Sequence, residues 1–150
     1  MALVAGLPRV EMLLNRVVVL QPDYFYGMPL LTAGGLASAR PAMLGGDLVR
    51  GKALLDRAVA VTGGRFLLAK FMYARLWALQ AQDHAVFCGL LKDVIEAPDD
   101  LLPEQQMMNN IAKIWASRWR ARAGDLFAEG GPCDPIEEPK TTEEDNGSLE

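Results

Sequence analysis

Apolar residues recur at spacings of three and four along most of the first 127 residues, which is the pattern of helices that bury one face. In the segment 48–62, for example, Leu48, Leu55 and Val59 fall on one stripe. Proline and glycine interrupt the pattern at intervals, and both residues end helices. The chain is therefore predicted to be all-α, with about six helices over residues 9–20, 24–38, 48–62, 66–80, 84–96 and 103–127.

Residues at the helix ends and interiors sharpen this prediction. Asp47 and Asp83 stand where a helix begins, and a carboxylate there accepts hydrogen bonds from free backbone amides. The pair Gly34-Gly35 inside a helix predicts close approach of a neighbouring helix, because glycine otherwise costs helix stability. The helix over 66–80 is apolar on most sides, so it is expected to lie between other helices.

Three segments resemble copies of one helix end. They are Leu13–Pro22, Leu54–Gly63 and Leu90–Asp99, and their matching leucines lie 41 and then 36 positions apart. Such a period is typical of stacked helix-turn-helix arrays. We therefore predict a tetratricopeptide-like stack of antiparallel helix pairs, an architecture that usually binds other molecules rather than catalysing reactions.

The helix over 9–20 is expected to be the second member of a pair whose first member is missing. Leu13, Leu14, Val17 and Val18 are predicted to pack on the next two helices. Other apolar residues, such as Val10 and Val19, are predicted to stay uncovered and to promote self-association, so that a homo-oligomer is one expected state.

Charge divides the chain at residue 128. The whole chain has a net charge of −4, but residues 1–128 hold 14 Lys/Arg against 11 Asp/Glu, whereas residues 129–150 hold one Lys against eight Asp/Glu. We predict a helical-repeat domain over residues 1–128 and a disordered acidic tail over residues 129–150, which is rich in proline, glycine and acids. No apolar run is long enough for a transmembrane segment, and the start lacks the basic region of a signal peptide.

Few residues could support catalysis or metal binding. His84, the single histidine, lies four positions before Cys88, but no third ligand accompanies them. The two cysteines, Cys88 and Cys133, have no spacing typical of a disulfide framework or a zinc site, and they leave the redox compartment undecided. We predict a surface histidine, a buried Cys88, no metal, no cofactor and no enzymatic activity.

A basic strip interleaved with tryptophans runs along residues 113–122. Charge with aromatic stacking is one way to hold single-stranded nucleic acid, and a basic amphipathic helix can also lie on a membrane. The acidic pI of about 5.0 disfavours nucleic acid as a partner. We expect Ile111, Ile114, Trp115 and Trp119 to pack inward while the arginines remain solvated, and the acidic tail could fold over this strip.

Aromatic residues with polar tips are the candidate ligand or partner site. Tyr24 and Tyr26 lie between the first two helices, and Tyr73 and Trp77 lie on the helix over 66–80. If the helices form a groove, these side chains could line it; ordinary packing between repeats is the alternative.

Several motifs in a fixed order resemble one family. They are Pro22-Asp23-Tyr24-Phe25-Tyr26-Gly27-Met28-Pro29, Gly45-Gly46-Asp47, Leu55-Asp56-Arg57-Ala58, Leu67-Leu68-Ala69-Lys70, Tyr73-Ala74-Arg75, Leu102-Pro103-Glu104-Gln105 and Asp125-Leu126-Phe127. Over about residues 9–128 the chain resembles the T component associated with tripartite ATP-independent periplasmic (TRAP) transporters. From this resemblance we expect the N-terminal part of that family to be missing from the chain, and we do not expect the acidic tail to be a family feature.

The resemblance implies a helical-repeat protein, exported to the periplasm, that associates with the extracytoplasmic solute receptor. For the family it also implies a proposed trimer with a cavity that conducts a small ligand. The expected function is therefore non-enzymatic binding of the receptor, of a small partly apolar ligand, or of both. The alternative is a cytoplasmic tetratricopeptide-like adaptor that grips a peptide of a partner protein.

Overall fold

The computed structural model describes residues 6–136, and within them the fold is helical without strands. Its α-helices are α2 (Leu7–Leu20), α3 (Tyr24–Ala39), α4 (Leu48–Val61), α5 (Leu67–Tyr73), α6 (His84–Glu96), α7 (Gln106–Ala121) and α8 (Ala123–Leu126). Shorter turns of helix are η1 (Ala42–Leu44), the π-helical η2 (Ala74–Ala78) and η3 (Pro103–Gln105). The all-α prediction is confirmed, with seven α-helices in place of about six.

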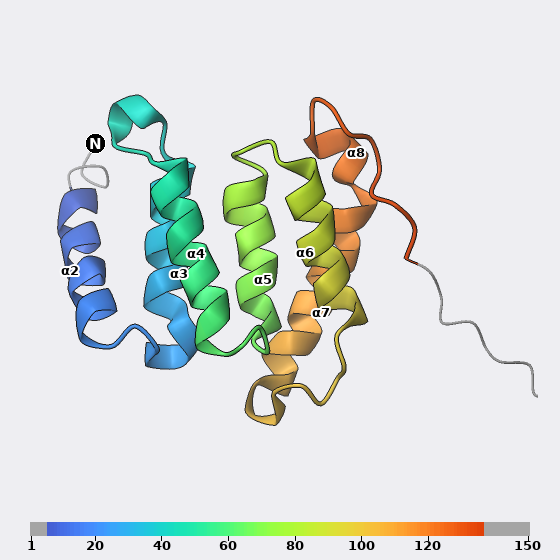
Figure 1. Ribbon diagram of the computed structural model, residues 1–150, viewed down its shortest axis with the longest axis horizontal. Helices are drawn as coiled ribbons and strands as arrows, with labels where there is room; N and C mark the ends of the chain where they lie inside the picture. Colours follow the sequence, from blue (N-terminus) through green and yellow to red (C-terminus); the bar gives the residue numbers. More distant parts are fainter. Residues whose placement is uncertain (1–5, 137–150) are drawn as a thin grey trace, which may run out of the picture.

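The helices form a stack of antiparallel neighbours (Figure 1). α4 packs along α3 and lies in front of it in the view, while α7 packs along α6 and lies behind it. α5 lies in the middle and contacts α3, α4, α6 and α7, as expected of a helix that is apolar on most sides. This stacking is compatible with the predicted tetratricopeptide-like arrangement.

The core runs through the middle of this stack. Its fully buried large side chains are Leu30, Leu55, Phe66, Leu67, Phe71, Phe87, Leu91 and Val94. Leu55 and Leu91 are equivalent residues of two sequence repeats, and both are completely buried. Leu14, the equivalent residue of the first repeat, is only half-buried because α2 lies at the end of the stack, against α3.

The packing predicted for the first helix is partly wrong. α2 contains no buried residue, Leu13 is 59% exposed, and Val17 is also exposed. Only Val18 of the predicted set packs against the core, while Val10 and Val19 are exposed as predicted. Because α2 packs mainly against α3, only a narrow stripe of its surface is covered.

The predicted close approach at the glycine pair is confirmed. A Cβ atom on Gly34 would lie 2.7 Å from Leu55 Cγ and 3.1 Å from the carbonyl oxygen of Gly51 on α4. A Cβ atom on Gly35 would lie 2.7 Å from Leu76 Cδ1. The two glycines therefore let α3 approach α4 on one side and η2 on the other.

Three helices differ from their predicted course. Phe25, Tyr26 and Gly27 adopt left-handed backbone angles, with φ of 43°, 58° and 84°, so the regular part of α3 begins only after them, and Pro29 then stands in its first turn. The helix predicted over 66–80 changes to π geometry at Ala74. The helix predicted over 103–127 is divided at Arg122 into α7 and α8. Apolar spacing is nearly the same in all these variants, so the pattern does not separate them.

The segment predicted as a disordered tail begins with ordered residues. Residues 129–136 run along α6 and α7, where Cys133 bonds to Cys88 and Arg120 donates a hydrogen bond to the backbone oxygen of Asp134. The remainder of that prediction, for residues 137–150, lies outside the described residues.

Candidate functional site

Tyr73 and Trp77, two of the predicted site residues, lie side by side. They are four positions apart on α5 and η2, and their rings meet edge to face with centroids 5.8 Å apart. The Tyr73 hydroxyl donates to Asp56 Oδ1 at 2.7 Å, and Trp77 Nε1 donates to the backbone oxygen of Leu48 at 2.8 Å. Both side chains are mostly buried, with 5% and 8% of their surface exposed, so each presents only an edge to solvent.

Lys52 completes this cluster from α4. Its Nζ atom lies 3.1 Å from Asp56 Oδ2 and within 6 Å of both ring centroids, at 5.8 Å for Tyr73 and 5.6 Å for Trp77. An ammonium group at this distance is attracted to the ring faces. The Tyr73 hydroxyl and the Asp56 carboxylate raise the pKa of Lys52. Burial, and then the hydrogen bond to Asp56, raise the pKa of Tyr73 against the opposing effect of Lys52.

A surface groove of about 370 Å³ opens beside this cluster, between α4 and η2. Its lining is mostly apolar, with Leu48, Val49, Ala53, Trp77 and Ala81 forming the walls and Lys52 and Asp56 the polar part. A concave surface of this size, apolar with a few placed polar groups, is the usual form of a small-molecule site. We call it the Trp77 groove.

Tyr24 and Tyr26, the other predicted site residues, lie elsewhere. Tyr24 is exposed at the start of α3, and Tyr26 packs on Phe66 with ring centroids 5.3 Å apart. Tyr26 lines a separate hollow of about 380 Å³ together with Arg65 and Glu104. Of the four aromatic residues, Tyr73 and Trp77 therefore lie together, Tyr26 lines a different hollow, and Tyr24 is exposed.

A second groove was not predicted from the sequence. It measures about 280 Å³ and lies between α3 and the helix formed by α5 and η2. Its lining is almost entirely apolar and comprises Met28, Leu31, Thr32, Gly35, Leu36, Ala39, Met72 and Leu76. Gly35 was the available signal, because the missing side chain lets Leu76 approach α3 closely at one wall of this groove.

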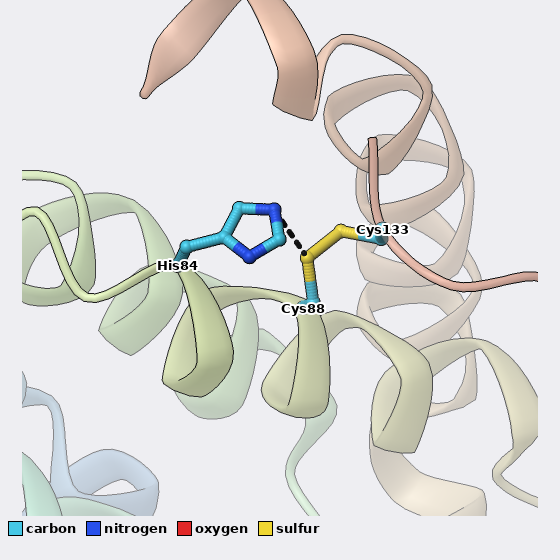
Figure 2. A group of neighbouring side chains, drawn as sticks. All are labelled: His84, Cys88 and Cys133. Carbon is cyan, nitrogen blue, oxygen red and sulfur yellow. Dashed lines mark hydrogen bonds between the residues drawn. A yellow bond between two sulfur atoms is a disulfide. The ribbon is translucent and has the colours of Figure 1, made fainter. Parts of the chain in front are cut away.

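The predictions for the two cysteines are wrong. Cys88 and Cys133 form a disulfide that joins α6 to the segment after α8, and Cys88 is half-buried (Figure 2). His84 Nε2 lies 3.4 Å from Cys88 Sγ and 3.0 Å from the backbone oxygen of Gly131. Cys133 is also the third donor that the sequence pattern lacked, because the ligand atoms of these three residues all lie within 4.8 Å of one another. While the two sulfur atoms are bonded to each other, neither is the thiolate that binds metals.

A model of the TRAP transporter T-component family matches residues 1–127, which include every helix of the described residues. The chain belongs to the TRAP transporter T-component family. Among curated proteins, none matches it. Membership makes this T component an accessory part of a transport system and associates it with TRAP transport. Among the described residues of the T component, no helix is long and apolar enough to span a bilayer.

In the basic strip of the T component, Arg118 and Arg122 are exposed as predicted, whereas Lys113 and Arg120 are half-buried. Arg120 donates to the backbone oxygen of Cys88 at 3.1 Å, and the Arg75 guanidinium lies 5.3 Å from the centroid of the Trp119 ring. Ile114 is exposed, and Trp115, although 40% exposed, packs against Phe71 with ring centroids 5.6 Å apart, so the predicted inward packing is only partly observed. The strip is therefore occupied in part by contacts within the protein.

Proposed function

We propose that this T component is a non-enzymatic helical-repeat binding protein that binds the extracytoplasmic solute receptor of a TRAP-type transporter, a small partly apolar ligand, or both. The Trp77 groove is the observation that carries this proposal. Its volume of about 370 Å³ falls within the range of small-molecule sites, roughly 300–1,000 Å³. Its walls suit an apolar body, and Lys52 and Asp56 offer a charged or hydrogen-bonding group at one side.

The groove is held in shape before any ligand arrives. Trp77 is fixed by its hydrogen bond to Leu48, and Tyr73 is fixed by its hydrogen bond to Asp56. Both bonds connect η2 or α5 to α4, so they tie together the two helices that form the groove. A site that needs little rearrangement loses little affinity to the cost of ordering its side chains.

Exposed apolar residues beside the groove are suited to docking of the receptor. Met43 and Leu44 on η1 and Val49 on α4 are exposed, and Val49, at 82%, also lines the groove. Leu48 lines both the groove and the neighbouring hollow beneath η1. A receptor bound over this surface would cover the mouth of the groove, which is the arrangement that transfer of a ligand between the two proteins requires.

The disulfide supports a periplasmic location. Disulfides persist in oxidising compartments such as the bacterial periplasm and are rare in the cytosol. A chain with the Cys88–Cys133 bond therefore fits export better than the cytoplasmic alternative. The bond also argues against an enzyme with a Cys88–His84 nucleophile pair, because a bonded sulfur is not a nucleophile.

Fluorine NMR tests the ligand site directly. The chain has three tryptophans, so replacement of each with 5-fluorotryptophan gives three resonances, and Trp77→Phe identifies one of them. Titration with 4-phenylbutyrate and with 4-phenylbutanol should shift the Trp77 resonance saturably and leave those of Trp115 and Trp119 in place. Lys52→Met should weaken the binding of 4-phenylbutyrate more than that of 4-phenylbutanol. Lys92→Met, which changes a surface lysine of α6, should leave both affinities unchanged. Shifts confined to Trp115 or Trp119, or no shift at millimolar probe, would refute the site.

A second candidate function is a peptide-binding adaptor. The apolar groove between α3 and α5 favours it, since apolar grooves between helices accept amphipathic peptide helices. In that case isolated tail peptides of partner proteins should bind in fluorescence anisotropy, and Leu36→Gln on this groove should abolish binding while Trp77→Phe should not. Binding of the phenylalkyl probes without any peptide binding would reject the adaptor.

A further inference from the structure

The Cys88–Cys133 disulfide fastens the chain segment that follows α8 to the outside of α6. The two residues are 45 positions apart in sequence, and their Cα atoms lie 5.6 Å apart. Beside the disulfide, residues 129–136 are held by the His84–Gly131 and Arg120–Asp134 hydrogen bonds. The sulfur–sulfur bond is thus the one covalent attachment of this segment to α6.

The surroundings of the two sulfur atoms differ. His84 stands one helical turn before Cys88 on α6, and its Nε2 atom contacts Cys88 Sγ at 3.4 Å (Figure 2). Because the same nitrogen also lies 3.0 Å from the carbonyl oxygen of Gly131, it carries the hydrogen and donates. A donor beside Cys88 stabilises negative charge on that sulfur when the bond breaks. The described residues provide no hydrogen bond to the Cys133 sulfur.

The disulfide is also accessible. A surface hollow of about 330 Å³ adjoins it, lined by His84, Cys88, Lys92, Arg120 and Asp134 among others. Lys92 and Arg120 supply positive charge, opposed by the carboxylate of Asp134 and by that of Glu96, whose Oε1 atom lies 3.8 Å from Lys92 Nζ. Cys88 and Cys133 are both half-buried and not enclosed. A small reagent therefore has a route to the disulfide: the hollow is lined by Cys88 and by Asp134, the residue after the half-buried Cys133, and its two cations favour a reagent that carries negative charge.

We propose that Cys133 is a thiol–disulfide exchange site for small anionic thiols. The thiolate of the reagent attacks Cys133 Sγ, a bond forms between these two sulfurs, and the Cys88–Cys133 bond breaks. The electron pair of the broken bond stays on Cys88, which leaves as a thiolate beside the His84 N–H. A second molecule of the thiol then attacks its own sulfur in the mixed disulfide, which releases the oxidised reagent and leaves Cys133 as a thiolate.

The direction of attack follows from the leaving group. Exchange is faster when the departing sulfur is better able to carry negative charge, and His84 gives Cys88 that advantage. The product keeps the modification on the segment after α8 and leaves the reduced sulfur on α6. Residues 129–136 then keep only non-covalent contacts with α6 and α7, so modification at Cys133 loosens the attachment of the chain that carries the acidic tail.

Peptide mapping tests this assignment on the full oxidised chain. Glutathione is added, the reaction is stopped with acid at an early time, free thiols are blocked with N-ethylmaleimide, and the chain is digested with trypsin. Cys88 falls in the tryptic peptide 76–92 and Cys133 in 123–140. We expect glutathione on peptide 123–140 and N-ethylmaleimide on peptide 76–92, in excess over the reverse pattern by about three- to tenfold.

Two variants separate the role of His84 from that of the charged hollow. His84 makes an edge-to-face contact with Phe127, and His84→Phe keeps a ring there but removes the N–H. The partition, which is the ratio of glutathione on Cys133 to glutathione on Cys88, should then fall toward one. Lys92→Gln should leave the partition unchanged and slow glutathione relative to the uncharged thiol 2-mercaptoethanol. Because the partition is a ratio within one sample, it does not depend on how far a variant loosens the segment.

Three results would overturn the proposal. The first is a glutathione adduct mainly on Cys88 or equally on both cysteines of the unmodified chain. The second is a partition that His84→Phe leaves unchanged. The third is a disulfide that reacts only after the protein is unfolded by denaturant. Should His84→Phe fail to fold, as judged by circular dichroism, the partition in the unmodified chain still decides the proposal.

Discussion

Asn109 is expected to be the most sensitive polar residue of the fold. It lies on α7 with 2% of its surface exposed, and its side chain bonds the start of α5. Its Oδ1 atom accepts from the backbone N–H of Leu67 at 2.9 Å, and its Nδ2 atom donates to the backbone oxygen of Arg65 at 3.0 Å. These two bonds fix the start of α5 against α7, and α5 continues into η2, which carries Trp77.

The cost of removing this side chain can be worked from its partners. In Asn109→Leu the N–H of Leu67, a completely buried residue, would lose its acceptor, which costs about 1–3 kcal/mol. Loss of the bond to Arg65, an exposed residue, adds about 0.5–1.5 kcal/mol. We therefore expect the free energy of unfolding to fall by about 2–4 kcal/mol, or roughly 4–12 °C in melting temperature.

Urea unfolding, followed by tryptophan fluorescence and far-ultraviolet circular dichroism, measures this loss. Asn110→Leu is the matched control, because Asn110 is the next residue on the same helix and is exposed. Its effect should stay within about 0.5 kcal/mol. A loss below about 1 kcal/mol for Asn109→Leu, or an equal loss for both variants, would refute the reasoning.

Three further predictions concern the Tyr73 hydroxyl, the Cys88–Cys133 disulfide and the exposed face of α2. Burial first, and the hydrogen bond to a carboxylate second, raise the pKa of Tyr73, so the folded state holds this proton more tightly than the unfolded state does. Stability should therefore decrease as the pH rises above about 10, and Tyr73→Phe should show a smaller decrease; equal slopes in urea titrations would contradict this. Cys133→Ser should lower the free energy of unfolding by up to about 4 kcal/mol, from the 45-residue separation, and a reductant should abolish the difference between the two proteins. Val19→Asp on the exposed face of α2 should weaken self-association in sedimentation velocity, whereas a concentration-independent monomer of the unmodified chain would contradict the role of that face.

Local rules predicted much of the fold. Asp47 and Asp83 cap α4 and α6 as expected, accepting from the backbone amides of Arg50 and Val86 at 2.9 and 3.0 Å. Both caps depend on residues three positions apart, and apolar stripes likewise depend on neighbours one turn away. Such features are visible in the sequence because the helix itself brings the residues together.

Features that depend on tertiary contacts were not predictable. The disulfide joins Cys88 to a residue in an irregular segment, and no spacing rule states which loops return to a helix. In the sequence, Asn109 looks like an ordinary polar residue of a helix, because its hydrogen-bond partners lie more than 40 positions away. The burial of α2 was also not predictable, because it depends on how many helices surround α2 and not on the apolar pattern of α2 itself.

The candidate site was predicted in part for the same reason. Tyr73 and Trp77 are one turn apart, so their proximity follows from the helix. Lys52 and Asp56 join them only through the packing of α4 on α5, which the sequence does not state. Tyr26 was placed with them on the assumption of one groove, and the left-handed turn that directs it toward Phe66 was not foreseen.

Titration of the cognate solute receptor into the full chain by isothermal calorimetry tests the central claim most directly. The account predicts saturable binding that Val49→Glu, at the rim of the Trp77 groove, weakens at least tenfold, or about 1.4 kcal/mol. Met107→Glu, an equally charged change at an exposed apolar residue of α7, should leave the affinity unchanged. Absence of binding at receptor concentrations up to about 100 µM, or equal loss in the two variants, would contradict the account.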